Sequence, residues 1–303
     1  MAIKKLDQLL KMDFQNRSIL AVVASQDEEV LDAVVEAHKL GIIEPILIGD
    51  REKTREIASR KKLDIENFEI IDEKDLEKAA EIGVRLVSQG RANFIMKGLV
   101  DTATLMKAVL NKEWGLRTDS LLSHVMIYDI PTYHKLIYLT DGGMNLNPTL
   151  EHKIKIVENS IKVVKALGNP TVKVACLAAK EKVDPKMIAT VDALELKKKS
   201  ETGYFGEEVI VDGPMALDLA VSKDAAKIKN YDSQVSGDAD VLLVPNIEMG
   251  NGIGKSITYF AKGKSAGVIM GAKAPILLVS RADTYESKLY SIALGSEVSK
   301  YIF

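Results

Sequence analysis

Residues 19–49 read ILAVVASQDEEVLDAVVEAHKLGIIEPILIG and contain a complete strand–helix–strand pattern. The apolar run at 19–23 predicts a short buried strand. Residues 28–40 repeat apolar positions at helical spacing, and Gly41 then predicts the end of that helix. The next apolar run, at 45–48, predicts a second strand. Two continuous apolar strands joined by a helix are typical of a parallel sheet that is buried on both faces.

The same alternation continues along the rest of the chain. Further strands are expected at 69–71, 93–96, 123–128, 135–139, 172–177, 209–211, 241–244 and 276–279. The sequence therefore predicts an α/β protein with mostly parallel sheets and helices on both sides. So many strands are unusual for one open sheet, and a polar loop at 141–148 interrupts the pattern, so two domains are expected.

Composition and charge exclude several classes of protein. The 303 residues carry a net charge of −2, which gives no reason to expect a nucleic-acid or membrane-surface partner. No run of 18 apolar residues is present, and the N-terminus lacks the pattern of a signal peptide, so we expect a cytoplasmic protein. Cys176 is the only cysteine and lies in an apolar strand pattern, which favours an inert core thiol over a nucleophile. No two histidines have metal-ligand helical spacing, so no metal is expected.

A glycine-rich segment is the densest candidate for binding an anion. Residues 245–256, PNIEMGNGIGKS, follow a predicted strand and precede a helical pattern. Glycines let a backbone approach a ligand closely, amides at a helix N-terminus favour an anion, and Lys255 adds positive charge. The spacing does not match a P-loop, because Met249 stands where that motif has its first glycine. We predict an anion-binding loop, with an ordinary tight turn as the alternative. Candidate contacts are Asn246, Asn251, Gly252, Gly254 and Lys255.

A second candidate segment follows the predicted strand at 276–279. Ligands in open α/β sheets bind beyond the carboxyl ends of the strands. Arg281 suits a bidentate phosphate contact, and Ser280 can donate a hydrogen bond. Asp283 is either a helix cap or a catalytic group. Glu286 is either exposed helix surface or a general base.

Two more cationic residues, Lys97 and Arg117, are candidates for contact with an anionic ligand. Lys97 ends the predicted strand at 93–96 and is followed by a glycine, which gives it either a surface role or an anion contact. Arg117 lies in a polar loop before the next apolar strand and would be unremarkable alone.

Long stretches of the chain resemble the phosphate acetyl/butyryltransferase family. They include MKGLVDTATLMKAVLNKEWGLRTDSLLSHV from residue 96, DGGMNLNPTLEHK from 141, SGDADVLLVPNIEMGNGIGKS from 236 and APILLVSRADT from 274. Several long matches in one order are far more specific than any short motif. The sequences MKGLVDTATLM and SRADT most resemble those of the butyryl branch.

This resemblance implies a fold like that of isocitrate and isopropylmalate dehydrogenases. Two α/β/α domains would enclose an interdomain cleft. The first would comprise residues 1–135 and 275–303, and the second residues 136–274. The family resemblance also implies a homodimer or higher homo-oligomer, with neither a metal nor a redox cofactor.

The implied reaction converts butyryl-CoA and inorganic phosphate to butyryl phosphate and CoA, reversibly and by direct transfer. Ser280 matches a family serine that orients the thiol or stabilises the oxyanion, and Arg281 matches an arginine that holds phosphate. Arg117 matches another arginine that faces the anionic substrate. The family's proposed base is an aspartate seven positions after the serine, but here that position is Ser287. Asp283 and Glu286 are then the nearest candidates for the base, and transfer without a protein base is also open.

Three alternatives accompany this hypothesis. A phosphate acetyltransferase would have the same chemistry with acetyl-CoA. An NAD-dependent dehydrogenase would use the implied fold for other chemistry, because fold does not determine function. A protein that binds an anion or CoA without catalysis is the third.

Overall fold

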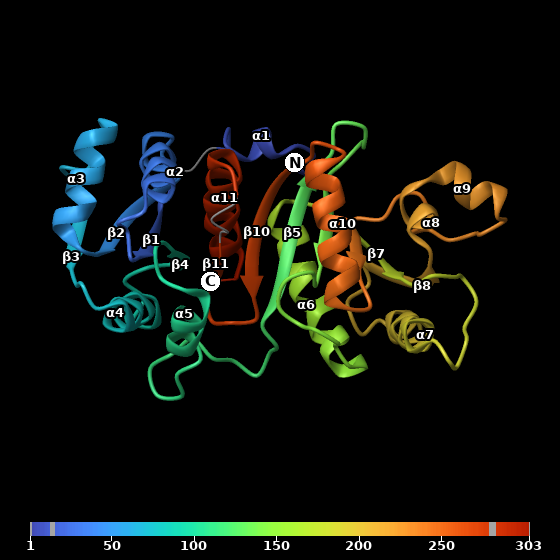
Figure 1. Ribbon diagram of the computed structural model, residues 1–303. Coiled ribbons are helices and arrows are strands. Elements are labelled where there is room, and N and C mark those ends of the chain that lie inside the picture. Colours follow the sequence, from blue (N-terminus) through green and yellow to red (C-terminus); the bar gives the residue numbers. More distant parts are fainter. Residues whose placement is uncertain (1, 13–15, 279–282, 303) are drawn as a thin grey trace. The chain divides into compact units, whose positions relative to one another are not determined.

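The computed structural model describes residues 2–12, 16–278 and 283–302 and contains two compact units (Figure 1). The first unit comprises Leu6–Ser120 and Ser265–Phe303, and the second comprises Met1–Lys5 and Leu121–Lys264. The predicted domain boundaries, 1–135 with 275–303 and 136–274, stay a prediction.

The first unit is a sheet with helices on both faces. Its strands are β1 (Ser18–Val23), β2 (Ile43–Gly49), β3 (Glu69–Asp72), β4 (Phe94–Lys97), β10 (Lys264–Met270) and β11 (Ile276–Leu277), in the spatial order β3-β2-β1-β4-β11-β10. Its helices are α1 (Leu6–Leu9), α2 (Glu28–Lys39), α3 (Arg51–Lys61), α4 (Leu76–Ser88), α5 (Thr102–Val109) and α11 (Tyr285–Ile302). Neighbouring strands from β3 to β11 are parallel, and β10 is antiparallel to β11. Figure 1 shows α2 and α11 on one side of these strands and α4 and α5 on the other.

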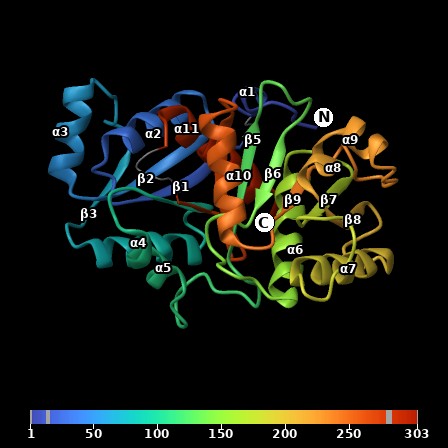
Figure 2. The same ribbon diagram turned by 45° about the vertical axis from the view of Figure 1, so that its right-hand side comes forward.

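The second unit repeats this layered arrangement. Its strands are β5 (Ser123–Asp129), β6 (Ile137–Thr140), β7 (Val172–Leu177), β8 (Val209–Met215) and β9 (Val241–Leu243), in the order β5-β6-β9-β7-β8. Its helices are α6 (Leu150–Ala166), α7 (Ile188–Glu201), α8 (Leu217–Val221), α9 (Lys223–Ile228) and α10 (Ile247–Tyr259). Only β5 and β6 among its paired strands are antiparallel. Residues of α8, α9 and α10 pack on the sheet in one core cluster, and Figure 2 shows α6 and α7 on the opposite side from α8 and α9.

Local chemistry explains where the helices begin and end. The carboxylates of Asp27, Asp50 and Asp101 each accept a hydrogen bond from a backbone N–H in the first turn of α2, α3 and α5, which satisfies donors that the helix leaves free. Helix α2 ends before Gly41, whose φ of +75° suits glycine. The α/β class and the mostly parallel pairing predicted from the sequence are confirmed.

One strand was not predicted. Strand β10 has the sequence KSAGVIM, in which a glycine interrupts a short apolar run. It pairs with β11 through the connection 271–275. A glycine inside a strand weakens the side-chain pattern by which a strand is recognised. In the described part of the chain, no helix is both long and apolar enough to cross a membrane.

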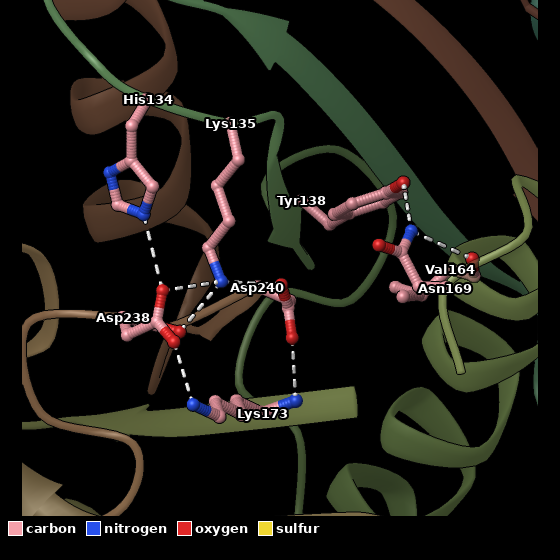
Figure 3. Close-up of polar contacts among 8 residues, drawn as sticks. All are labelled: His134, Lys135, Tyr138, Val164, Asn169, Lys173, Asp238 and Asp240. Atoms are coloured by element: carbon pink, nitrogen blue, oxygen red, sulfur yellow. Dashed lines mark hydrogen bonds and ion pairs between the residues drawn. The ribbon is translucent and has the colours of Figure 1, made fainter. Parts of the chain in front are cut away.

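A charged network joins the amino-terminal ends of β6, β7 and β9 in the second unit (Figure 3). Asp238 accepts hydrogen bonds from Lys173 Nζ at 2.6 Å and pairs with Lys135 Nζ at 3.0 Å and His134 Nε2 at 3.1 Å. Lys135 also contacts Asp240, at 2.6 Å. Partial burial alone would raise the pKa of Asp238, but the hydrogen bonds from Lys173, Lys135 and His134 outweigh it and hold that pKa well below its usual range.

We expect this network to make stability depend on acid pH. A carboxyl group whose pKa is depressed in the folded state stabilises the fold above its unfolded pKa of roughly 4, and this contribution is lost as pH falls below that value. The variant Asp238→Asn removes the charge at every pH. Its deficit in free energy of unfolding relative to wild type should therefore be present at pH 5 and shrink towards pH 3. Urea denaturation at each pH measures this difference, and a deficit that does not change with pH would contradict the assignment.

Candidate functional site

Three parallel strands of the first unit end at one edge of its sheet. Val23 at the end of β1 is opposite Lys97 in β4, and Met96 in β4 is opposite Leu277 in β11. The chain therefore leaves β11 at this edge, next to Lys97, where ligands of open α/β sheets bind. Ser280 and Arg281, which follow in the sequence, lie outside the described residues, so their roles stay predictions.

Lys97 is a buried cation at this edge, with only 8% of its surface exposed. Its ammonium donates hydrogen bonds to the carbonyl oxygens of Gly98 at 3.3 Å and Val100 at 3.1 Å. The turn is closed by a hydrogen bond from Gly98 N to Val23 O at 2.8 Å. A Cβ at position 98 would lie 2.3 Å from the Ala24 carbonyl oxygen, so this turn requires glycine. The lysine thus braces a strand-end turn, and contact with substrate stays a prediction.

The hydrogen bonds in the first turn of α11 show that Asp283 is not its cap. The hydroxyl of Thr284 accepts from Ser287 N at 3.2 Å, so Thr284 supplies the cap that was considered for Asp283. Lys288, which is 2% exposed, donates to the carbonyl of Asp283 at 2.6 Å and pairs with Glu29 at the start of α2. Asp283 is half-buried and Glu286 is exposed.

Ser287 stands seven positions after Ser280, where the resemblance noted in the sequence implies an aspartate base. Its hydroxyl lies 3.1 Å from the hydroxyl of Ser265 and 3.2 Å from that of Thr284. This serine therefore takes part in a neutral hydrogen-bond cluster. A hydroxyl with its ordinary chemistry is a poor proton acceptor compared with a carboxylate, so a base must come from elsewhere if the reaction uses one.

Arg117 lies at the other end of β11. The carbonyl of its neighbour Leu116 accepts a hydrogen bond from Lys273 N at 2.8 Å, and the Thr118 hydroxyl donates to Gly271 O. Residues 271–275 form the turn that precedes β11, so the loop of Arg117 rests at the amino end of that strand. Arg117 is exposed. Its loop is therefore not brought to the strand end that leads to Ser280 and Arg281.

The glycine-rich segment is a helix, so the predicted loop conformation was wrong, and its contact with an anion stays a prediction. Helix α10 begins directly after Asn246, whose side chain accepts from Met249 N at 3.0 Å and caps the first turn. Each glycine costs roughly 1 kcal/mol relative to alanine inside a helix, and close packing offsets this cost at two positions. A Cβ at Gly250 would lie 2.6 Å from Gly142 Cα, and one at Gly254 would lie 2.5 Å from the Tyr128 hydroxyl.

The other candidate contacts of this segment lie on the outer face of α10. Asn251, Gly252 and Lys255 are exposed, and a Cβ at Gly252 would meet nothing within 4 Å. Asn251 and Lys255 are four residues apart, so their side chains stand on the same side of the helix. Within the described ranges, we find no ion pair for Lys255. We call Asn251, Gly252 and Lys255 the α10 stripe. It leaves an amide and a cation available to an anionic ligand.

Asp141 is a buried charge that sequence reasoning did not single out. It follows β6 directly and is 2% exposed. One carboxylate oxygen accepts from the backbone N–H groups of Gly143 and Met144, each at 2.8 Å. The other accepts from His124 N at 3.1 Å and Asn145 Nδ2 at 2.6 Å. An acidic residue followed by two glycines at the end of a predicted strand was the available signal.

The described residues contain no group of three or more His, Cys, Asp or Glu side chains that could hold a metal ion. Cys176 is 3% exposed, and burial raises the pKa of its thiol, with Asp212 acting in the same direction. A thiol that resists ionisation is a weak nucleophile, which fits the expected core role.

Comparisons with known proteins agree over almost the whole chain. The family model Phosphate acetyl/butaryl transferase matches residues 3–82 and 73–295. A phosphate butyryltransferase of Clostridium acetobutylicum is 44% identical, covering 96% of both chains. A phosphate acetyltransferase of Thermotoga maritima is 40% identical, covering 96% of this chain and 98% of that protein.

Solved structures give the same result. A branched-chain phosphotransacylase from Enterococcus faecalis V583 matches with a TM-score of 0.83 at 35% identity, covering 93% of this chain and 99% of that one. A 4-hydroxythreonine-4-phosphate dehydrogenase from Burkholderia phymatum matches with a TM-score of 0.55 at 13% identity, covering 93% and 98%, and so shares only the fold. From the near-full-length matches, the chain belongs to the phosphate acetyl/butyryltransferase family.

Proposed function

We propose that this protein is a phosphate butyryltransferase, which converts butyryl-CoA and inorganic phosphate to butyryl phosphate and CoA, reversibly. The observation that carries the proposal is the similarity, at 44% identity over 96% of the chain, to a protein named phosphate butyryltransferase. The 40% identity to a protein named phosphate acetyltransferase makes acetyl-CoA the second candidate substrate. The likeness to a dehydrogenase concerns the fold alone and does not favour redox chemistry.

The transfer is direct and takes place with both substrates bound. A phosphate oxygen attacks the thioester carbon, a carbon–oxygen bond forms, and the carbon–sulfur bond breaks to release CoA thiolate, which takes up a proton. In the reverse direction the CoA thiol must lose its proton, because a thiol is mostly protonated near neutrality. Charge that develops on the carbonyl oxygen needs donors, and holding both substrates together lowers the entropic barrier.

We assign roles within this scheme by combining the family motif with the observed geometry. Arg281 holds phosphate and Ser280 orients the thiol or stabilises the oxyanion. Lys97 lies at the end of β4, one residue beyond the Met96–Leu277 pair. A cation at the carboxyl end of parallel strands supports the binding of an anionic ligand at this edge. The α10 stripe contributes an amide and a cation in the second unit. Arg117 is kept as a contact to an anionic part of the substrate, from its loop at the amino end of β11.

The proposed reaction determines which cofactors, binding partners and cellular compartment we expect. CoA is substrate or product. The reaction transfers no electrons, so it needs no redox cofactor, and the proposed scheme assigns no step to a metal. The partners are acyl-CoA, inorganic phosphate and further copies of the same chain in a homodimer or larger homo-oligomer. Neither nucleic acid nor a membrane is a partner, and the protein works in the cytoplasm as part of butyrate metabolism.

Phosphate-dependent release of CoA tests the activity and the role of Arg281 together. Purified protein should release free thiol from butyryl-CoA faster than from acetyl-CoA, and only with phosphate present. The variant Arg281→Ala should lose about 100-fold in kcat/KM for phosphate, because a charge-assisted contact to the anion is removed. Arg60→Ala is the matched control, since Arg60 pairs with Glu28 on the exposed surface of the same unit. Faster turnover of acetyl-CoA would replace the butyryl assignment, and no turnover in folded protein would overturn the transferase.

The α10 stripe predicts a second effect on substrate affinity. Lys255→Met should raise the KM for an anionic substrate about fivefold to tenfold, because a single exposed contact to an anion is lost. Lys227→Met on α9, which also removes an exposed lysine of the second unit, should leave both KM values unchanged. Initial-rate kinetics with butyryl-CoA and phosphate varied in turn give the comparison. Equal KM values in both variants would remove Lys255 from the substrate site.

The two carboxylates near Ser287 give a test of the base. If Asp283 or Glu286 removes the thiol proton, its amide variant should lose about 100-fold in kcat for CoA plus butyryl phosphate near pH 7. The loss should shrink above pH 8.5, where a free thiol ionises by itself. Rates of Asp283→Asn and Glu286→Gln measured from pH 6 to 9 separate the candidates. Full activity in both variants would favour transfer by positioning alone.

A further inference from the structure

The four hydrogen bonds to Asp141 can be made only by a carboxylate. All four partners, the N–H groups of Gly143, Met144, His124 and Asn145 Nδ2, are donors. They divide equally between the two carboxylate oxygens. An asparagine has one oxygen and one amino group, so either orientation of its amide would place a donor against two donors. Leaving buried donors without acceptors costs free energy of folding. This position therefore requires a carboxylate rather than an amide.

The loop that Asp141 holds is packed against the start of α10. A Cβ at Gly142 would lie 2.9 Å from the carbonyl carbon of Gly250 and 3.2 Å from Asn251 N. The carbonyl of Leu146 accepts from Ile247 N at 3.0 Å, which ties the end of the loop to the first residue of the helix. The position of α10 therefore depends on the shape of the loop.

The loop is also fitted to β5. Asp141 accepts from the backbone of His124, and a Cβ at Gly143 would lie 2.5 Å from His124 Nδ1. Asn145 donates a second hydrogen bond to Leu122 O at 2.9 Å. With one side fixed to β5 and the other to α10, the loop has little freedom to adjust.

We propose that Asp141 is a positioning residue for acyl transfer: its carboxylate shapes the loop 141–146, and the loop sets where α10 presents Asn251 and Lys255 to the substrate. The inference rests on the proposed function and extends it to a residue that does not itself touch substrate. Asn251 follows Gly250, which is the residue that the loop contacts, so a shift of the loop is transmitted directly to the stripe. Small displacements of substrate-binding groups are enough to change catalysis strongly.

The test compares two variants that disturb the same contact from opposite sides. Asp141→Asn changes the loop, and Gly250→Ala changes the helix while the loop keeps its carboxylate. Both should raise the KM for butyryl-CoA or for phosphate about tenfold, with a smaller change in kcat. A merely structural role would lower the folded fraction and the apparent kcat without moving either KM.

Asp240→Asn is the matched control. Asp240 is also a buried aspartate of the second unit and accepts from Lys173 N at 2.8 Å and from Lys135 Nζ at 2.6 Å, but it lies at the amino ends of the strands. Its variant should lose stability in thermal denaturation and keep the wild-type KM values.

Each outcome decides a separate question. Unchanged KM values in folded Asp141→Asn and Gly250→Ala, with an active wild type, would overturn the positioning role alone. If Asp141→Asn does not fold, Gly250→Ala carries the decision. A wild type that does not turn over any acyl-CoA would overturn the proposed function, and the positioning role with it.

Discussion

Direct contact between backbone segments, with no side chain between them, underlies the strand-end turns of both units. In the first unit, the turn after β4 approaches the carbonyl of Ala24 so closely that only glycine fits at position 98. In the second, Gly142 and Gly250 bring a loop and a helix together in the same way. Side chains can rotate to relieve a poor fit, but backbone cannot. Each of these close backbone contacts lies beside a charged residue, Lys97 or Asp141, that hydrogen-bonds to the turn.

Much of the fold was predictable because its determinants are local. Apolar runs such as 19–23 and 172–177 became buried strands, since a strand covered on both faces needs little more than continuous apolar side chains. The aspartates before α2, α3 and α5 are local caps as well, because the donor that each satisfies lies three residues away. Family membership was also recognisable from the sequence, because several long motifs of the family occur in the same order along the chain.

The site was less predictable because it depends on contacts between distant residues. The glycines of α10 suggested a loop from their own preferences, yet two of them serve packing against Gly142 and Tyr128, which no local pattern reveals. Asp141 gains its role from donors that include His124, on a strand whose register with β6 is a tertiary property. The loop of Arg117 is tied to residues 271–273, more than 150 positions away, and so lies at the amino end of β11. Thr284 replaced Asp283 as the cap of α11, a difference of one residue that sequence preference does not resolve.

The path of the chain through the two units has a consequence for the order in which they are made. The second unit is formed almost entirely by residues 121–264, a single continuous stretch. The first unit, in contrast, contains β1 to β4 from the early part of the chain, but β11, the neighbour that covers the edge of β4, comes only after residue 275. During translation, the strands β5 to β9 have all been made while β4 still has an open edge. Open strand edges invite pairing with other chains, so the nascent protein is open to misassembly at β4 until the ribosome has made β11.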